Sequence, residues 1–162
     1  MPEIRVGQGF DVHPFSDDPG RRLVLGGVAF DGRGLSGHSD ADVVAHAVTD
    51  ALLGAAGLGD IGQRYPDTDP AHAGADSMDL LADSVAAVRA DGWEVANVDC
   101  TVVLEAPRLA SRRTDMQEAL AVVVGAAVTI KGKRAEGLGA IGREEGVACF
   151  AVALLTRPGT PS

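Results

Sequence analysis

The sequence predicts a single α/β (α+β) domain in which a mixed β-sheet carries helices packed on one face. The length of 162 residues leaves room for one domain of ordinary size. Hydrophobic residues make up 46% and charged residues 23%, a balance typical of a folded globular chain. Strand-like apolar runs alternate with segments of helical period, in the order strand, hairpin, two helices, strand, helix and two strands.

The first elements are predicted to be extended. Residues 4–9 form a mostly apolar segment that predicts the first strand. The runs 23–25 and 28–30 flank Gly26-Gly27, and this pair favours a two-residue hairpin turn because glycine accepts a positive φ at both positions.

An amphipathic helix is predicted over residues 41–56. Its apolar residues recur with helical spacing on one face, and Gly57 is placed to end it. Ser39 or Asp40 can cap its start. Ser39 followed by Asp42 resembles a capping box in which aspartate replaces the usual glutamate.

The next segment, residues 58–75, is rich in Gly, Asp and Pro and predicts a long irregular loop, a feature that is usually functional in a small domain. The remaining helices are expected over 77–90 and 113–124, and the remaining strands over 95–104, 128–133 and 147–155. We assign residues 1–156 to the domain. Residues 157–162, which read Arg-Pro-Gly-Thr-Pro-Ser, are expected to form a flexible C-terminal tail.

Acidic residues dominate the charge, with 23 Asp+Glu against 14 Lys+Arg and a net charge of −9. This balance argues against a nucleic-acid partner, because such proteins present a basic patch. The N-terminus carries no apolar stretch, and the longest apolar run, residues 119–130, is too short to cross a bilayer. Cys100 and Cys149 are too few for a disulfide framework, so we expect two buried thiols in a soluble, cytoplasmic protein without membrane partners.

Asp11, His13 and His46 are candidate metal ligands. Asp11 and His13 lie two residues apart in an extended segment, so their side chains point the same way. One carboxylate and two imidazoles suit zinc, and three protein ligands leave a fourth position open, as in catalytic zinc sites. Asp42 or Asp50, each four residues from His46, could hold its second ring nitrogen. From spacing alone, His46 could equally be an ordinary helical histidine that binds no metal, which is the commoner case.

Two further segments could bind phosphate. Residues 37–42 open the predicted helix, and the free N–H groups of a helix N-terminus suit an anion. His38 and Ser39 could add side-chain donors there, although the segment could simply cap the helix. In residues 131–137 basic side chains leave a strand, and Glu136 supplies the oxygen ligand that Mg²⁺ prefers. A solvated loop is the alternative for this second segment.

Short motifs follow one another over nearly the whole chain, from about residue 4 to residue 155. They read Gly9-Phe10-Asp11-Val12-His13, His38-Ser39-Asp40-Ala41-Asp42-Val43, His46, Thr49-Asp50-Ala51-Leu52-Leu53-Gly54-Ala55, Leu58-Gly59-Asp60-Ile61-Gly62, Tyr65-Pro66-Asp67-Thr68-Asp69-Pro70, Asn97-Val98-Asp99, Ala106-Pro107-Arg108 and Gly142-Arg143-Glu144-Glu145-Gly146-Val147-Ala148-Cys149. Together they resemble the 2-C-methyl-D-erythritol 2,4-cyclodiphosphate synthase family. Several motifs at family spacing are far more specific than the candidate zinc set alone.

The resemblance implies a phosphorus–oxygen lyase of non-mevalonate isoprenoid biosynthesis. Such an enzyme converts 4-diphosphocytidyl-2-C-methyl-D-erythritol 2-phosphate into the cyclic 2,4-diphosphate and releases CMP. It also implies a homotrimer with active sites shared between neighbouring subunits, whose axis can hold an isoprenoid diphosphate. One zinc per subunit would lie on Asp11, His13 and His46, and Mg²⁺ or Mn²⁺ would bind with the substrate diphosphate near Glu136.

The same resemblance assigns roles to the motif residues. His38, Arg134 and Glu136 would be the catalytic group. The substrate-binding residues would be Asp11, Val12, His13, His38, Ser39, Asp60, Ile61, Gly62, Tyr65, Pro66, Asp67, Thr68, Asp69, Leu104, Glu105, Ala106, Pro107, Arg108, Leu109, Ala110, Lys133, Arg134, Ala135, Glu136, Ala140 and Arg143. Residues 60–69 would meet the ribose and the methylerythritol, and residues 104–110 would form the cytidine pocket.

The chain departs from the family pattern at Arg108, at Ala140 and in the run Lys133-Arg134-Ala135, where the family commonly has threonines before the glutamate. Arg134 stands where a threonine usually hydrogen-bonds the reacting phosphate, and its longer side chain could donate more strongly or point away. Arg108 replaces a usual lysine and keeps the charge with a different geometry. Ala140 replaces a usual phenylalanine of the axial cavity, while the matching Arg143 is present.

Other functions fit parts of the sequence. A zinc hydrolase would use the open metal position to activate water and would need no cytidine pocket. A non-catalytic trimer would bind zinc and CDP ligands without releasing CMP. A purely structural zinc site is disfavoured, because the set has three ligands rather than four.

Overall fold

A computed structural model describes residues 1–159 of the chain. Its strands are β1 (Glu3–Pro14), β2 (Leu23–Leu25), β3 (Val28–Phe30), β4 (Glu94–Val103), β5 (Ala127–Lys133) and β6 (Gly146–Arg157). Its helices are α1 (Val43–Ala56), α2 (Ile61–Arg64), α3 (Ser77–Ala90), α4 (Arg113–Val124) and α5 (Gly139–Gly142), with a 3₁₀ turn at Pro70–His72.

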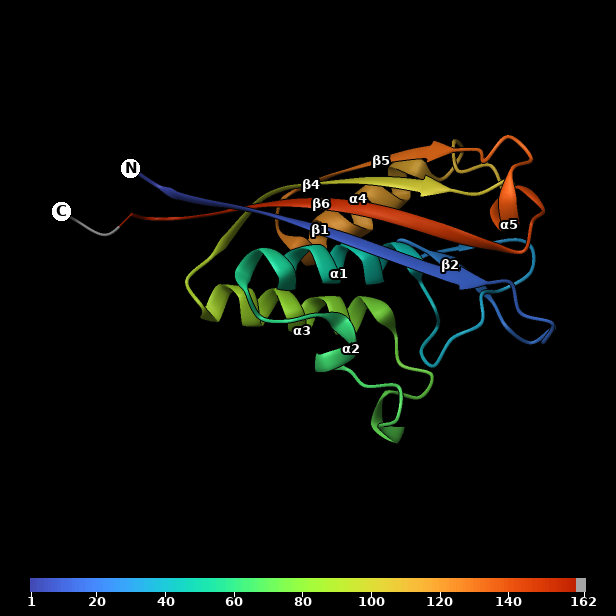
Figure 1. Cartoon of the computed structure of the whole chain (residues 1–162), viewed down its shortest axis with the longest axis horizontal. Helices are drawn as coiled ribbons and strands as arrows, with labels where there is room; N and C mark the ends of the chain where they lie inside the picture. The colour runs from blue at the N-terminus through green and yellow to red at the C-terminus, as the bar shows by residue number, and fades with distance from the viewer. Residues whose placement is uncertain (160–162) are drawn as a thin grey trace.

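Four strands form the main sheet in the order β1-β6-β4-β5, and β2 pairs with β3 in a separate hairpin. β4 and β5 run parallel across the crossover that contains α4, whereas the other neighbours are antiparallel. Helices α1, α3 and α4 all lie on one side of the sheet (Figure 1). The mixed sheet with helices on one face is therefore confirmed, and the predicted bounds of α3 and α4 match the structure.

Within residues 1–159 no helix covers the other face of the sheet (Figure 1), and apolar side chains of β1 and β6 are exposed there. These exposed residues are Ile4, Val6, Phe10, Val12, Phe150 and Val152. The rings of Phe10 and Phe150 lie opposite each other on β1 and β6, with centroids 4.8 Å apart. A contiguous apolar patch of this kind usually marks an interaction surface.

Glycines let α1 lie directly on the backbone of β1. A Cβ built at Gly9 would fall 1.9 Å from the carbonyl oxygen of Ala47, and Gly7 meets α1 in the same way. Any side chain at these positions would push the helix away from the strand. The close approach places His46 beside Asp11, which follows Gly9 by two residues on the same face of β1.

The start of α1 differs from the prediction. The helix begins at Val43, and its N-cap is Asp42 rather than Ser39 or Asp40. Asp42 Oδ1 accepts hydrogen bonds from the N–H groups of the second and third helical residues, at 3.0 and 3.1 Å. The same carboxylate accepts from both glycines of the β2–β3 turn. The capping-box prediction is therefore wrong, and these N–H groups, which we expected to face a phosphate, already have a partner.

Other boundaries shift because distant strands pair. β1 continues to Pro14 rather than ending near residue 9, since β6 pairs with it along its full length. The predicted loop 58–75 contains α2 and the 3₁₀ turn, and α5 was not predicted. β6 extends to Arg157, one residue into the predicted tail, and Arg157 Nη2 lies 2.7 Å from Glu3 Oε2.

Two smaller expectations can be compared with the structure. Cys100 and Cys149 are free, buried thiols, as predicted. Within residues 1–159, every helix is too short or too polar to cross a bilayer. The last part of the predicted tail, residues 160–162, lies outside the described residues.

Candidate metal centre and active site

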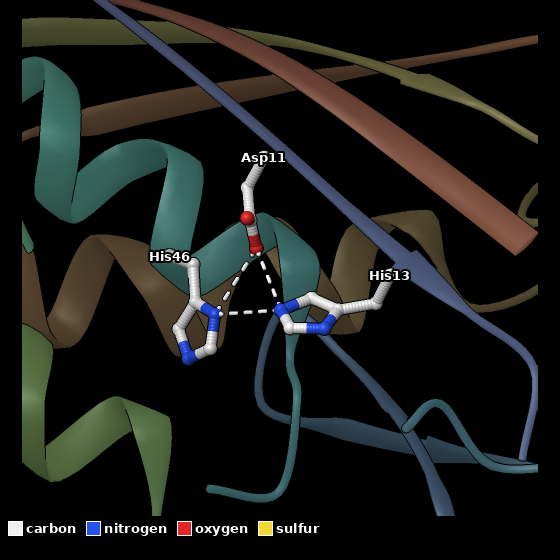
Figure 2. A group of neighbouring side chains, drawn as sticks. All are labelled: Asp11, His13 and His46. Carbon is white, nitrogen blue, oxygen red and sulfur yellow. Dashed lines mark hydrogen bonds and ion pairs between the residues drawn. The ribbon is translucent and has the colours of Figure 1, made fainter. Parts of the chain in front are cut away.

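Three candidate ligands meet between β1 and α1. Figure 2 shows the side chains of Asp11, His13 and His46 pointing toward one another. Asp11 Oδ2 lies 3.0 Å from His13 Nε2 and 3.0 Å from His46 Nδ1, and the two ring nitrogens are 3.2 Å apart. In a tetrahedral zinc site with bonds of about 2.0–2.1 Å, neighbouring ligand atoms lie about 3.3 Å apart. The cluster could therefore hold a metal ion on one triangular face of a tetrahedron.

Each imidazole has a partner for the nitrogen that faces away from this cluster. His13 Nδ1 lies 2.8 Å from the carbonyl oxygen of Ser36, so it donates and leaves Nε2 free to coordinate. His46 Nε2 lies 2.8 Å from Ser77 Oγ and 3.1 Å from Ser39 Oγ. Both rings are thus oriented with one nitrogen toward the position of a metal.

The expected partners of His46 make other contacts. Asp42 caps α1, as described above, and Asp50 Oδ1 accepts a 2.9 Å hydrogen bond from the N–H of Ile61. The prediction that one of these carboxylates holds His46 is wrong, because the second ring nitrogen lies beside the hydroxyls of Ser77 and Ser39 instead. Ser77 on α3 is the nearer partner of His46 Nε2. It lies 31 residues from His46 in the sequence, so no local motif could predict the contact.

The charge of Asp11 favours metal binding, whereas protonation of His13 opposes it. Burial raises the pKa of Asp11, but its interactions with the imidazoles of His13 and His46 outweigh this effect and hold the pKa well below its usual range. Burial lowers the pKa of His13, but the hydrogen bond and the charge of Asp11 raise it above its usual value overall. Because a protonated imidazole cannot coordinate a metal, metal binding at His13 competes with protonation of its ring.

The cluster opens into a cavity of about 440 Å³. Its predicted lining residues are Asp11, His13, His38, Ser39, His46, Ile61, Gly62, Tyr65, Pro66 and Asp67. His72 and Leu80 also line it and were not predicted, and Gly37 comes from the segment 37–42 that we predicted to bind phosphate. The ring of His72 packs edge-on against Tyr65 with centroids 5.5 Å apart.

The other residues predicted for this side lie nearby or face away. Asp60 caps α2 through a 2.8 Å bond from the N–H of Gln63, and Asp69 offers a carbonyl oxygen 3.0 Å from His38 Nε2. Thr68 lies in an exposed turn between them. The exposed side chain of Val12 points to the opposite face of β1 from Asp11 and His13, so only its backbone lies on the cavity side.

A second cavity, of about 270 Å³, lies where β4 and β5 end. Its lining residues are Leu104, Glu105, Pro107, Arg108, Leu109, Ala110, Arg113, Gly132, Lys133 and Arg134. Arg113 was not predicted, and Gly132 comes from the segment 131–137 that could contact phosphate. Arg134 Nε lies 3.3 Å from Glu105 Oε2, and Glu105 Oε1 also accepts from the N–H of Ala135 at 2.8 Å. The side chain of Arg134 is therefore turned toward Glu105.

Several predicted residues lie outside these two cavities. Ala106 lines a smaller cavity of about 180 Å³ beside Pro107. Glu136 lies exposed in the turn after β5 with a left-handed backbone (φ 55°). Ala140 is exposed on α5, and Arg143 Nε lies 2.6 Å from Glu145 Oε1. The first cavity, which contains the Asp11–His13–His46 cluster, is the metal cavity. The second, lined by Arg108, Arg113, Lys133 and Arg134, is the cationic cavity. In the described chain the two cavities share no lining residue.

Comparison with known proteins places this architecture in a family. The profile of the YgbB family matches residues 4–156. The chain belongs to the YgbB family. A relative from Azoarcus sp. (strain BH72), named 2-C-methyl-D-erythritol 2,4-cyclodiphosphate synthase, is 57% identical over 158 residues, which cover 95% of this chain and 96% of the relative. The resemblance seen in the sequence motifs is thereby confirmed.

Solved structures agree with this YgbB-family assignment. The IspF of Plasmodium falciparum, in a CDP complex, is 31% identical with a TM-score of 0.83, and the match covers 96% of this chain and 97% of that chain. The bifunctional IspDF of Campylobacter jejuni is 42% identical with a TM-score of 0.92. That match covers 98% of this chain and 43% of the longer bifunctional chain.

Proposed function

We propose that this chain converts 4-diphosphocytidyl-2-C-methyl-D-erythritol 2-phosphate into 2-C-methyl-D-erythritol 2,4-cyclodiphosphate and releases CMP. The observation that carries the proposal is a three-ligand metal cluster that opens into a 440 Å³ cavity, in a YgbB-family chain 57% identical to a relative named for this synthesis. The reaction is that of a phosphorus–oxygen lyase in isoprenoid biosynthesis.

The chemistry needs no protein nucleophile. An oxygen of the 2-phosphate attacks the β-phosphorus of the CDP group, and the bond from that phosphorus to the oxygen shared with the α-phosphorus breaks as CMP leaves. A phosphate monoester is largely dianionic at neutral pH, so a general base is not required. The protein must fold the substrate so that attacking and leaving oxygens lie in line. Orientation of an intramolecular attack can contribute about 7–11 kcal/mol.

Zinc and a second ion fit the ligands of this chain. Asp11, His13 and His46 would hold zinc, which would supply charge to polarise a phosphoryl oxygen, and Glu136 would help to hold Mg²⁺ or Mn²⁺, which would neutralise the diphosphate. Three N/O ligands with one open side suit zinc, and a lone carboxylate suits a hard cation that shares the diphosphate.

We assign the remaining roles by position. His38 and Ser39 lie on the metal cavity and hold the phosphate end through side-chain donors. Residues 60–69 hold the methylerythritol, and residues 104–110 hold the cytidine. Because Arg134 is turned toward Glu105, it contributes positive charge near the diphosphate rather than the direct hydrogen bond of a threonine.

A homotrimer with shared active sites is part of the proposal. One substrate must reach both the metal cavity and the cationic cavity, yet the two share no lining residue within the described chain. The uncovered apolar face of the sheet offers the surface for assembly of the 1–156 domain. On the trimer axis, an isoprenoid diphosphate would meet Arg143, and Ala140 would leave more room there than phenylalanine.

Shared sites predict that inactive subunits rescue one another. His46→Ala removes a metal ligand, and Arg108→Ala removes a cation of the second cavity. If each site takes His46 from one subunit and Arg108 from the next, equal co-expression leaves about one quarter of the sites intact. We therefore expect CMP release near that fraction of the wild-type rate. No recovery in the mixed trimers would mean that each site lies within one chain.

The activity itself is tested by the products. Zinc- and Mg²⁺-loaded protein should release CMP in amounts equal to the substrate consumed, with no inorganic phosphate, when the mixture is separated by chromatography. Inorganic phosphate would indicate a zinc hydrolase. Bound nucleotide without any CMP release would indicate a non-catalytic binder.

A further inference from the structure

A serine and an aspartate stand behind His46, on the side away from the metal cluster. Ser77, the first residue of α3, is fully buried, and its Oγ lies 2.8 Å from His46 Nε2. The Ser77 hydroxyl donates a short hydrogen bond to Asp40 Oδ1, and its backbone N–H lies 3.3 Å from Asp40 Oδ2. A line of hydrogen bonds thus runs from a carboxylate, through a hydroxyl, to the imidazole.

The direction of these bonds selects one tautomer of His46. An ionised carboxylate can only accept, so the Ser77 proton points at Asp40. The Ser77 oxygen then accepts, and His46 Nε2 donates its N–H. A neutral imidazole protonated at Nε2 carries its lone pair on Nδ1, the atom that faces Asp11 in the metal cluster.

This selection opposes the pull of Asp11. Asp11 Oδ2 lies 3.0 Å from His46 Nδ1, and without a metal it would favour a proton on that nitrogen, the form that cannot coordinate. His13 needs no such help, because the carbonyl oxygen of Ser36 can only accept and fixes its tautomer directly. A hydroxyl can donate or accept, so behind His46 a third group must set the direction.

We propose that Ser77 and Asp40 are positioning residues that hold His46 in its metal-binding tautomer. The inference rests on the proposed function only in taking zinc as the metal. Ser39 Oγ, which lies 3.1 Å from the same nitrogen and accepts from the N–H of Ala41, is a second acceptor that partly replaces Ser77 when Ser77 is removed.

Zinc affinity measured by competition with a chelator tests this role. Ser77→Ala is expected to weaken zinc binding about 10–100-fold, the usual effect of losing a hydrogen-bond partner of a ligand. Asp40→Ala is expected to do the same, because the freed hydroxyl can donate to His46 Nε2 and stabilise the wrong tautomer. Asp40 Oδ1 also accepts from the N–H of Asp42, but its effect on the His46 tautomer passes through Ser77, so in the Ser77→Ala background Asp40→Ala should not shift the tautomer further.

Ser84→Ala is the matched control. Ser84 is also fully buried on α3, but its hydroxyl contacts Leu80 O and Tyr65 rather than a metal ligand. We expect its zinc affinity to match the wild type. Thermal melts of the metal-free variants separate loss of zinc affinity from loss of the fold. If Asp40→Ala does not fold, Ser77→Ala and the double variant Ser39→Ala/Ser77→Ala carry the test.

Long-range ¹H–¹⁵N NMR of the histidine rings gives a readout that a purely structural role would not move. Metal-free wild type should populate the Nε2–H tautomer of His46, and Ser77→Ala should shift it toward Nδ1–H. If zinc affinity and the His46 tautomer were unchanged in Ser77→Ala and in Ser39→Ala/Ser77→Ala, this inference would be overturned, and the proposed metal centre would stand. A wild-type chain that binds no zinc would overturn the proposed metal centre, and this inference with it.

Discussion

Replacing His46 with alanine is expected to remove zinc from the protein and to reduce CMP release at least about a thousandfold. The substitution leaves two ligands, Asp11 and His13, which cannot define a catalytic zinc site. Loss of the ion removes several kcal/mol of charge stabilisation, and each 1.36 kcal/mol corresponds to about tenfold in rate. Zinc content by mass spectrometry and the initial rate of CMP release measure the two effects.

His72→Ala is the control for that experiment. His72 lines the same cavity but packs against Tyr65 and makes no contact with the metal cluster. We expect this variant to keep one zinc per chain. If His46→Ala kept its zinc and released CMP at the wild-type rate, the cluster between β1 and α1 would not be the catalytic centre.

The second large effect is expected at Gly9. Its Cα faces the backbone of α1, and a methyl group there would lie 1.9 Å from the carbonyl oxygen of Ala47. Neither backbone can give way without separating the helix from the sheet, so Gly9→Ala should cost more than about 4 kcal/mol of unfolding free energy. Denaturant unfolding at a fixed protein concentration, which matters for the proposed trimer, measures this loss.

Gly54→Ala is the control for Gly9→Ala, because the same change of residue is expected to raise stability there. Gly54 is exposed within α1, and a Cβ there meets no atom within 4 Å. Alanine is the better helix former, so stability should rise by about 0.5–1 kcal/mol. Wild-type stability in Gly9→Ala would contradict the direct contact of α1 with β1, and with it the way in which His46 reaches Asp11.

The parts of the fold that sequence predicts well are those set by local periodicity. The apolar spacing of residues 77–90 and 113–124 gave the bounds of α3 and α4 directly. The two-residue period of an extended segment put Asp11 and His13 on one face, and the resemblance to a known family, rather than spacing, added His46 to them.

The parts that sequence did not predict depend on distant contacts. Ser39, Asp40 and Asp42 are all good N-caps, and only the β2–β3 turn, whose glycines bind the Asp42 carboxylate, decides among them. Ser77 reaches His46 from another helix, and no local pattern marks it. Arg113 begins α4, and only the packing of that helix brings its side chain to the second cavity.

The central claim is that this chain closes a cyclic diphosphate on a metal centre built from Asp11, His13 and His46. The most direct test is ³¹P NMR of the zinc- and Mg²⁺-loaded protein with 4-diphosphocytidyl-2-C-methyl-D-erythritol 2-phosphate. Two mutually coupled signals of the cyclic diphosphate, together with the signal of CMP, are the predicted result. A signal of inorganic phosphate, or unchanged substrate beside a zinc-loaded protein, would contradict the claim.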